Sequence, residues 1–281
     1  MLATAIHRPA TPEEALAPEA LDFYRKSMNL LKEAKVPFLV GGAYAFARYT
    51  GIVRHTKDFD VFIHPRDFSR ALDAFAAAGY EVDRTFPYWL GKAFQGDDFV
   101  DLIFGSGNGI ARVDDVWFEK APEDEVLGIP VQLIPAEEMI WSKGFIMERE
   151  RFDGADVAHV LYSRAADLDW QRLLDSFGDH WKVLLTHLLL FGYIYPDDAG
   201  RIPSALLDQL LKRAGEPAPK NHPDAQGPLC QGTILSRSQY LVDIEDRGYR
   251  DARLEPLGPM TAKDIAHWTA AAREEEAKRK G

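Results

Sequence analysis

The sequence predicts an α+β fold, with a mixed-sheet half over about residues 1–134 followed by a helical half over about residues 135–281. Three observations support this prediction. Near the N-terminus a short apolar strand, a helix and a second strand follow one another, which is typical of a sheet covered by helices. A hairpin signal then adds antiparallel strands, so the sheet is mixed. Beyond Pro135 the chain is mostly helical in pattern.

The composition is that of an ordinary globular chain. Of its 281 residues, 46% are hydrophobic and 27% are charged, which excludes a disordered, collagen-like or disulfide-stapled protein. The single cysteine, Cys230, cannot form an internal disulfide, and the first residues lack the features of a signal peptide. The longest apolar run, around Val183–Ile194, falls well short of the ~20 residues of a membrane span. We therefore expect a cytoplasmic protein without a membrane partner.

The charge is unevenly distributed along the chain. There are 33 Lys and Arg against 44 Asp and Glu, a net charge of −11, which disfavours broad, non-specific binding to nucleic acids or membranes. Residues 31–70 nevertheless carry seven basic and four acidic side chains, a local charge of +3. The overall acidity is therefore compatible with a local anion site.

The first elements follow from helix caps and apolar periodicity. Thr11 and the following Pro-Glu-Glu form a helix start, and Pro18 restarts the helical pattern, which ends near Ala34. The apolar run 36–40 predicts a short buried strand that leads directly into two glycines, and residues 43–50 follow as a helix.

Further strands complete the predicted sheet. Alternating apolar and acidic residues predict a strand over about 58–63, and a helix over 65–79 ends at a glycine. A strand over 80–84 precedes the hairpin, whose strands 88–95 and 99–104 flank a Gly-Asp-Asp turn.

The remaining elements are one strand and a series of helices. The strand covers 129–134, and the chain is then helical to about Leu211. A loop over about 216–228 and a mixed segment precede a last helix, which Thr261 caps.

Asp58 and Asp60 are the most informative pair of residues. On a strand, residues i and i+2 point to the same face, so the two carboxylates project together while Phe59 enters the core. Neighbouring carboxylates repel each other unless a cation or a proton lies between them, and Mg²⁺ takes oxygen ligands. The alternative interpretation is a solvated strand face on which Asp-x-Asp occurs by chance.

Asp101 strengthens the metal interpretation. It lies in the otherwise apolar run 99–104, where a carboxylate is unfavourable unless it is paired, binds a metal or faces an open side. Three carboxylates from two strands can hold two divalent ions, Mg²⁺ or Mn²⁺. That arrangement serves in-line phosphoryl or nucleotidyl transfer.

Gly41 and Gly42 form a candidate phosphate site between a strand and a helix. Glycines let backbone N–H groups approach an anion, and a helix N-terminus favours phosphate. A plain tight turn is the alternative interpretation.

Together these features resemble the DNA polymerase β-like nucleotidyltransferase superfamily. A strand, Gly41-Gly42 and a helix are followed, after fifteen intervening residues, by Asp58-x-Asp60, and a third Asp lies on a later strand. The chain is especially similar to minimal bacterial members. These include the antibiotic nucleotidyltransferases and the abortive-infection toxins of type IV toxin–antitoxin systems. The resemblance covers about residues 36–165.

The resemblance implies a role for each motif. Gly41 and Gly42 would contact the triphosphate of an NTP, and Asp58 and Asp60 would bind metals. Asp101 would be the third carboxylate and would assist deprotonation of the acceptor hydroxyl. Many members have Ser after the first glycine, where this chain has Gly42. Backbone N–H groups would then replace a hydroxyl contact to phosphate.

Three basic residues are candidate nucleotide ligands. Arg54 and Lys57 immediately precede the carboxylate pair and could steady triphosphate charge, although ordinary surface exposure is the alternative. Lys143 lies in the helix after Pro135, within an apolar stripe, where a lysine must extend to solvent or meet an anion. The stripe consists of Met139, Ile140, Ile146 and Met147.

The type IV toxins carry a Lys, an Arg and an Asp-rich turn downstream of the metal strands, and the sequence after Lys143 is similar. By this resemblance Lys143 would bind nucleotide, and Asp153 or Asp156 would orient a basic group. The alternative for the two aspartates is helix capping, with Asp153 as the cap and Asp156 in the first turn.

The sequence thus predicts a Mg²⁺- or Mn²⁺-dependent nucleotidyltransferase, which transfers NMP from an NTP to an acceptor hydroxyl and releases pyrophosphate. Residues 1–134 would form the catalytic domain and residues 135–281 a helical C-terminal domain. The acceptor, whether a small molecule, RNA or a protein, stays open, as does the oligomeric state. The alternative function is a non-catalytic nucleotide-binding module that retains the fold.

Overall fold

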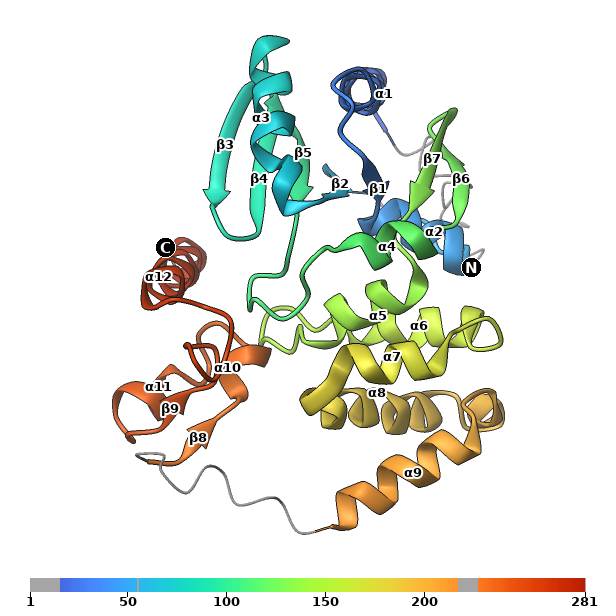
Figure 1. The fold of residues 1–281 in the computed structure, drawn as a ribbon, viewed down its shortest axis with the longest axis vertical. Coiled ribbons are helices and arrows are strands. Elements are labelled where there is room, and N and C mark those ends of the chain that lie inside the picture. The colour runs from blue at the N-terminus through green and yellow to red at the C-terminus, as the bar shows by residue number, and fades with distance from the viewer. Residues whose placement is uncertain (1–15, 55, 217–226, 281) are drawn as a thin grey trace, which may run out of the picture. The chain divides into compact units, whose positions relative to one another are not determined.

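The computed structural model describes three stretches of the chain, residues 16–54, 56–216 and 227–280 (Figure 1). The helix start predicted at Thr11 lies outside these stretches. Within the described residues, no helix is both long and apolar enough to cross a membrane.

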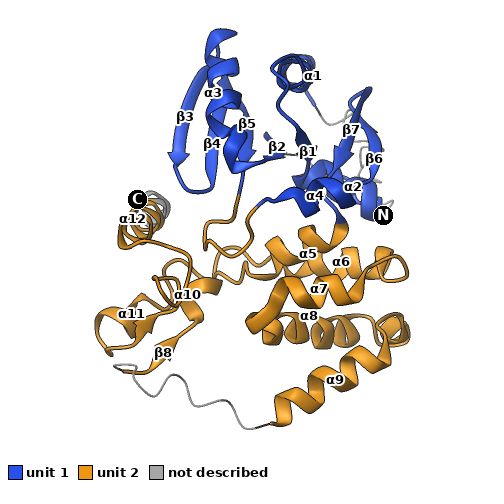
Figure 2. Ribbon diagram, in the orientation of Figure 1, with its two compact units in different colours: residues 1–104, 113–135 blue, residues 105–112, 136–281 orange. Residues whose placement is uncertain are grey.

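The chain divides into two compact units (Figure 2). The first unit comprises residues 1–104 and 113–135 and contains all strands of the large sheet. The second comprises residues 105–112 and 136–281 and is mostly helical.

The first unit is built on a seven-stranded sheet with the strand order β3-β4-β5-β2-β1-β7-β6. Strands β2 and β5 pair in parallel, as do β1 and β7, and the other neighbours pair antiparallel. The predicted α+β class with a mixed sheet is therefore confirmed. The strands are β1 (Phe38–Val40), β2 (Asp58–Ile63), β3 (Glu81–Phe86), β4 (Leu90–Gln95), β5 (Asp98–Ile103), β6 (Glu123–Val126) and β7 (Ile129–Leu133).

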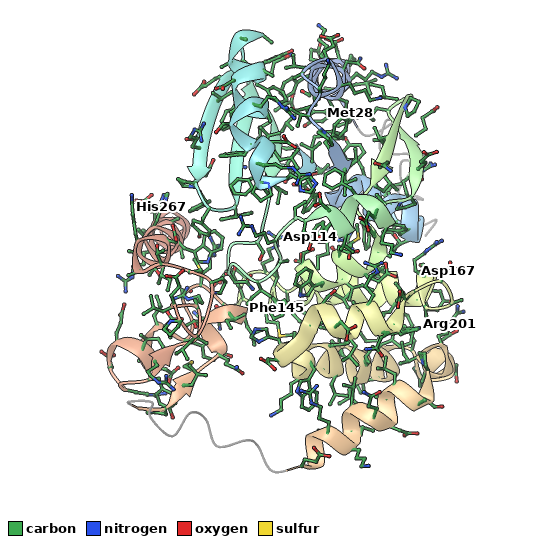
Figure 3. All side chains as sticks on the ribbon, viewed as in Figure 1. Met28, Asp114, Phe145, Asp167, Arg201 and His267 are labelled. Carbon is green, nitrogen blue, oxygen red and sulfur yellow. The ribbon has the colours of Figure 1, made fainter. Side chains whose placement is uncertain are left out.

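Helices of the first unit pack through their apolar faces. In α1, Phe23, Tyr24, Met28 (labelled in Figure 3) and Leu31 are completely buried, and their spacing places them on one face of the helix. The helices are α1 (Pro18–Glu33), α2 (Gly42–Thr50), α3 (Phe68–Ala77) and α4 (Asp115–Lys120), with a 3-10 turn η2 (Pro65–Asp67) before α3.

Two elements of this unit, α4 and β6, are not predicted by the sequence. Helix α4 is six residues long, too short for an apolar period to be recognised. Strand β6 is Glu-Asp-Glu-Val, an acidic strand at the edge of the sheet. It joins β7 through Leu127 and Gly128, both at positive φ (55° and 75°), and this pair lacks the Asn-Gly signal of such turns.

Helices dominate the second unit, as predicted. The core side chains of α8 include Leu184, Leu188 and Phe191, and Phe145 (labelled in Figure 3) stacks on Phe177 with 5.4 Å between ring centroids. The first helices are α5 (Ala136–Gly144), α6 (Gly154–Arg164), α7 (Trp170–Phe177), α8 (Trp181–Ile194) and α9 (Ser204–Gly215), with 3-10 turns η3 (Gly178–His180) and η4 (Pro196–Arg201).

The last part of the chain adds a small parallel strand pair and three helices to the second unit. Cys230 lies in this pair and is a free thiol. The elements are β8 (Leu229–Cys230), α10 (Gly232–Leu235), α11 (Leu241–Glu245), β9 (Arg250–Asp251) and α12 (Ala262–Lys280).

The prediction of an apolar stripe around Lys143 is wrong for its last two residues, Ile146 and Met147. Helix α5 ends at Gly144, so Ile146 and Met147 are not on the same helix face as Met139. The chain turns there, with the Ile146 N–H donating to the carbonyl of Lys143, and Met147 forms an isolated bridge with Phe152.

Candidate active site

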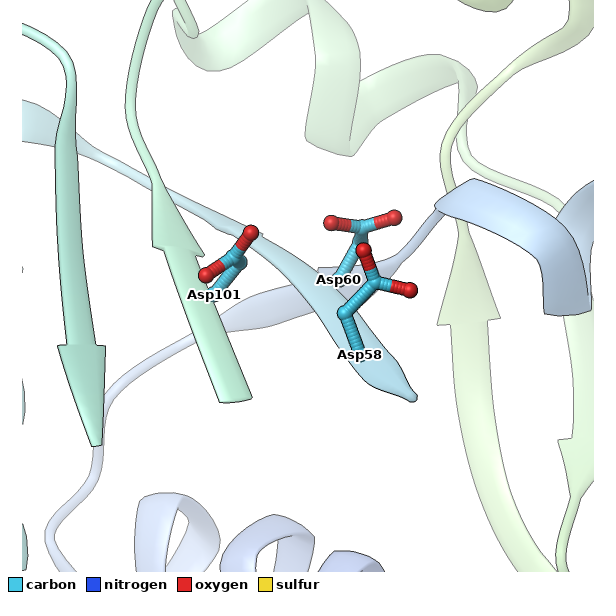
Figure 4. Close-up of side chains that lie close together, drawn as sticks. All are labelled: Asp58, Asp60 and Asp101. Atoms are coloured by element: carbon cyan, nitrogen blue, oxygen red, sulfur yellow. The ribbon is translucent and has the colours of Figure 1, made fainter. Parts of the chain in front are cut away.

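Three carboxylates meet on neighbouring strands of the first unit. Strands β2 and β5 are parallel and adjacent, and their register places Asp60 directly beside Asp101. Asp58, two residues before Asp60, projects from the same side of the sheet, whereas Phe59 is completely buried. Figure 4 shows the three carboxylates on one side of the two strands. The predicted orientation of this pair is therefore confirmed, and the fold adds Asp101 to it.

The spacing of these groups suits a divalent cation. Asp58, Asp60 and Asp101 each offer one carboxylate oxygen, and these oxygens lie within 4.8 Å of one another. Like charges at this separation repel, so a cation stabilises the cluster. An all-oxygen donor set is the one that Mg²⁺ and Mn²⁺ prefer, so these residues fit the predicted metal.

Asp101 forms an ion pair with Lys92 and is largely buried. Its side chain is only 13% exposed. Burial raises the pKa of the Asp101 carboxyl, the Lys92 ammonium opposes this shift, and the Asp58 charge adds to it, so that the net pKa lies above its ordinary value. A raised pKa favours a carboxylate that accepts a proton.

Lys92 is the residue that the sequence analysis missed. It lies on β4, directly opposite Asp101 in the antiparallel β4–β5 pairing. Its Nζ lies 2.5 Å from Asp101 Oδ1 and 4.0 Å from the centroid of the Phe99 ring. The hairpin turn predicted from the sequence has three residues, Gly-Asp-Asp, whereas Asp98 pairs with Gln95 in the structure. The turn is therefore two residues long, and this one-residue difference in register places Lys92 opposite Asp101.

Gly42 lies against the carboxylate of Asp60. Its φ is +52°, and a Cβ at this position would stand 1.8 Å from Asp60 Oδ2. Any side chain would therefore displace the proposed metal ligand, in addition to the strain of a positive φ. In this structure, position 42 therefore has no room for a side chain.

Gly41 has a different constraint. A Cβ there would stand 2.2 Å from Cε2 of Phe62, so the residue must be small. Its N–H donates to the Asp60 carbonyl at 2.9 Å and so belongs to the sheet. Helix α2 begins at the next residue, so Gly42 is the first residue of the helix N-terminus.

Two further side chains support the start of β2. The Thr56 hydroxyl donates to Oδ1 of Asp58. Tyr24, from α1, donates to the Lys57 carbonyl at 2.9 Å and stacks on Phe59 with 5.1 Å between ring centroids. Burial, together with four nearby Asp charges, raises the pKa of Tyr24, so its hydroxyl stays protonated and acts as a donor.

The basic residues before β2 are exposed. The Arg54 guanidinium lies over the Phe46 ring, 4.4 Å from its centroid, and the side chain of Lys57 faces solvent while its carbonyl accepts from Tyr24. Their assignment to the triphosphate stays a prediction.

Lys143 belongs to the second unit, where it pairs with both predicted aspartates. Its Nζ lies 2.9 Å from Asp153 Oδ2 and 2.8 Å from Asp156 Oδ2. The partnership expected for these aspartates is confirmed. Asp153 does precede α6, but its side chain makes no capping bond to the helix. Burial opposes its ionisation, yet Arg151 and Lys143 lower the pKa of Asp153 overall.

The chain was compared with protein families, curated proteins and solved structures. No protein-family model matches the sequence, and no curated protein matches it. Several solved structures to which the chain is similar are described as nucleotidyltransferases or adenylyltransferases. The antibiotic-resistance factor ANT(2'')-Ia is 15% identical with a TM-score of 0.38, over 70% of this chain and 100% of that chain.

Two further structures are similar to the chain. The lincosamide antibiotic adenylyltransferase LnuA is 13% identical with a TM-score of 0.37, over 52% of this chain and 96% of that chain. An antigenic nucleotidyltransferase-like protein from Paracoccidioides brasiliensis is 15% identical with a TM-score of 0.43, over 66% and 93%. Because these TM-scores are below 0.5, the assignment of an activity rests on the carboxylates and their surroundings.

Proposed function

We propose that the protein is a metal-dependent nucleotidyltransferase, which transfers NMP from an NTP to an acceptor hydroxyl with release of pyrophosphate. One observation carries the proposal: Asp58, Asp60 and Asp101 bring three carboxylate oxygens within 4.8 Å of one another. They do so beside Gly42 at the start of α2. Carboxylates for divalent ions and a helix N-terminus for phosphate are the two parts that such a transfer needs.

In this proposal Asp58, Asp60 and Asp101 hold Mg²⁺ or Mn²⁺, which would neutralise charge on the triphosphate and at the attacking oxygen. Gly42 leads the N-terminal turn of α2, whose free N–H groups and positive dipole end face the phosphates. Gly41 contributes through its small size, since its own N–H bonds to the sheet. Arg54 and Lys57 are assigned to the triphosphate. The nucleotide-binding role of Lys143, which pairs with Asp153 and Asp156 in the second unit, stays a prediction from the sequence resemblance.

The chemical step is an in-line displacement at the α-phosphorus. The acceptor oxygen forms a bond to this phosphorus while the bond to pyrophosphate breaks, and pyrophosphate leaves with its electron pair. Asp101, the third carboxylate of the cluster, takes the proton of the acceptor hydroxyl. Most of the rate enhancement would come from positioning and charge neutralisation.

The acceptor is a small molecule, an RNA end or a protein hydroxyl. The net charge of −11 disfavours a long RNA, which needs a basic track. Growth arrest on expression, relieved by Asp58→Ala, would favour the toxin interpretation. Normal growth of cells that make active enzyme would favour a small-molecule acceptor.

The decisive test is NTP turnover with Mg²⁺ or Mn²⁺. Wild type and Asp60→Asn are compared across each NTP and a panel of an aminoglycoside, a lincosamide, tRNA and protein acceptors. Asp73→Asn is the control, because Asp73 is an exposed carboxylate on α3. We expect pyrophosphate release by wild type and the control, and loss of release in Asp60→Asn.

Equal turnover in all three proteins would refute the metal assignment. The alternative, a nucleotide-binding module without turnover, would be supported by calorimetry that detects NTP binding with the same affinity in EDTA and in Mg²⁺.

A further inference from the structure

Lys92 and Asp101 form a cross-strand ion pair inside the proposed site. The two residues face each other in the β4–β5 hairpin, and their side chains are 20% and 13% exposed. Their charged atoms, Nζ and Oδ1, are 2.5 Å apart. The hairpin register holds both Cα atoms in place, so this contact is a built feature of the sheet.

A divalent ion on Oδ1 of Asp101 would compete with the Lys92 ammonium for this oxygen. Mg²⁺ binds carboxylate oxygen at about 2.1 Å, so an ion on Oδ1 of Asp101 would stand close to Nζ and repel it. The ammonium has a second interaction partner nearby, because it already lies 4.0 Å from the centroid of the Phe99 ring. Cation–π attraction there would offset part of the lost ion pair.

We propose that Lys92 is an internal counter-ion that makes the binding of a divalent ion at Asp101 depend on the nucleotide. This inference rests on the proposed function. Without nucleotide, Lys92 occupies Asp101, while Asp58 and Asp60 hold one ion. An arriving triphosphate supplies negative charge that compensates the displaced ammonium. The second ion and the nucleotide therefore bind with positive coupling, and each strengthens the other equally.

Lys92 is thus a positioning residue for the third carboxylate. The two-ion site would assemble only when substrate is present, which would keep Asp101 paired and protected from adventitious ions between turnovers. Because Lys92 is not one of the three carboxylates, a substitution of Lys92 changes the coupling between the second ion and the nucleotide and leaves Asp58, Asp60 and Asp101 intact.

The test counts bound Mn²⁺ by electron paramagnetic resonance, with and without α,β-methylene ATP or GTP. In wild type without the analogue we expect one tightly bound ion. With the analogue, the affinity for the second ion should rise at least about tenfold over its value without the analogue. In Lys92→Met the second ion should bind at least about tenfold more tightly than in wild type without analogue. The analogue should raise the affinity of this ion by a smaller factor than it does in wild type. Lys92→Arg should behave as wild type.

Matched variants separate this proposal from others. Lys26→Met removes an exposed lysine of α1 that pairs with Asp22 and should match wild type. Lys92→Gln repeats the test in case methionine impairs folding. In melting curves recorded in EDTA, the two uncharged variants, Lys92→Met and Lys92→Gln, should be less stable than Lys92→Arg. The lost counter-ion leaves a buried carboxylate unpaired in the neutral variants.

Two failures are distinguishable. In the first, Asp60→Asn abolishes Mn²⁺ binding, but wild type, Lys92→Met and Lys92→Gln bind Mn²⁺ equally and with the same coupling to nucleotide. This result would overturn the role of Lys92 alone. Mn²⁺ binding that is indifferent to Asp60→Asn, together with absent NTP turnover, would overturn the proposed function and this inference with it.

Discussion

The Cα of Gly42 lies so close to Asp60 that a Cβ would stand 1.8 Å from the Oδ2 atom of that carboxylate. The carboxylate of Asp60, a proposed metal ligand on β2, therefore occupies the space that a side chain on the first residue of α2 would need. This contact ties the start of the helix to the carboxylate cluster. It also means that the proposed phosphate-binding and metal-binding parts of the site are sensitive to the same substitutions.

Gly42→Ala is expected to weaken metal binding as well as stability. The positive φ alone destabilises an alanine by about 1–2 kcal/mol, and the added methyl group must displace Asp60. Gly51→Ala is the matched control, because Gly51 ends the same helix at φ +70° with nothing within 4 Å of its would-be Cβ. Urea unfolding should show a loss in both variants, and Mn²⁺ titration a loss in Gly42→Ala only. Equal Mn²⁺ affinity in the two would contradict the contact.

Tyr24→Phe is expected to loosen the start of β2 without disturbing the core. The ring stays stacked on Phe59, but the Lys57 carbonyl loses its donor, which costs about 1 kcal/mol. Because residues that support metal ligands tune affinity, Mn²⁺ binding should weaken by up to about tenfold. Tyr80→Phe, a change on a ring that packs on Phe23, is the control. Unchanged Mn²⁺ affinity in Tyr24→Phe would show that the bond supports folding alone.

Asp153→Asn is expected to change how stability depends on pH. The pKa of Asp153 is lowered in the folded protein. Its ionised form therefore stabilises the fold above the ordinary Asp pKa of about 3.9, and this stabilisation is lost as the pH falls through the lowered value. The melting temperature of wild type should exceed that of Asp153→Asn at pH 7, and the difference should shrink below about pH 4. A difference that stays constant down to pH 2.5 would exclude this linkage.

Arg172→Met is expected to destabilise the second unit strongly. Arg172 Nη2 lies 2.5 Å from Glu137 Oε2, and the guanidinium also pairs with Glu138, whose side chain is 3% exposed. Burial raises the pKa of Glu138 even with this partner. Removing the arginine should lower the free energy of unfolding by about 3–5 kcal/mol.

Arg164→Met is the control for this change. Arg164 pairs with Asp167 at the surface and its side chain is 39% exposed, so its loss should cost less than about 1 kcal/mol. Denaturant unfolding measures both variants, and a loss in Arg172→Met as small as in the control would mean that the buried pairs contribute little.

Much of the candidate site could be predicted because its signals are local. The two-residue period of a strand puts Asp58 and Asp60 on one face whatever the rest of the fold does. Asp101 drew attention because a carboxylate within an apolar strand needs a partner. By contrast, the pairing of Lys92 with Asp101 did not follow from the predicted three-residue turn, because the turn in the structure has two residues and the register differs by one residue.

Other features depended on packing that no local pattern reports. Strand β6 is acidic, pairs with β7 at the edge of the sheet, and is also held by an ion pair between Asp124 and Arg48 of α2. Helix α5 ends at Gly144, which packs against the Phe177 ring, so the apolar stripe expected to continue to Met147 is broken.

By itself, then, the sequence determined the mixed α+β class, the common face of Asp58 and Asp60, and the strand that carries Asp101. Periodicity and composition act over a few residues, and these properties need no more than that. The tertiary structure decided that β2 and β5 are neighbours in register, which brings the third carboxylate to the other two. It also decided that Gly42 must be a glycine, because Asp60 fills the space a side chain would need. Contacts between strands far apart in the chain arise only when the sheet is assembled, and that is where the site is made.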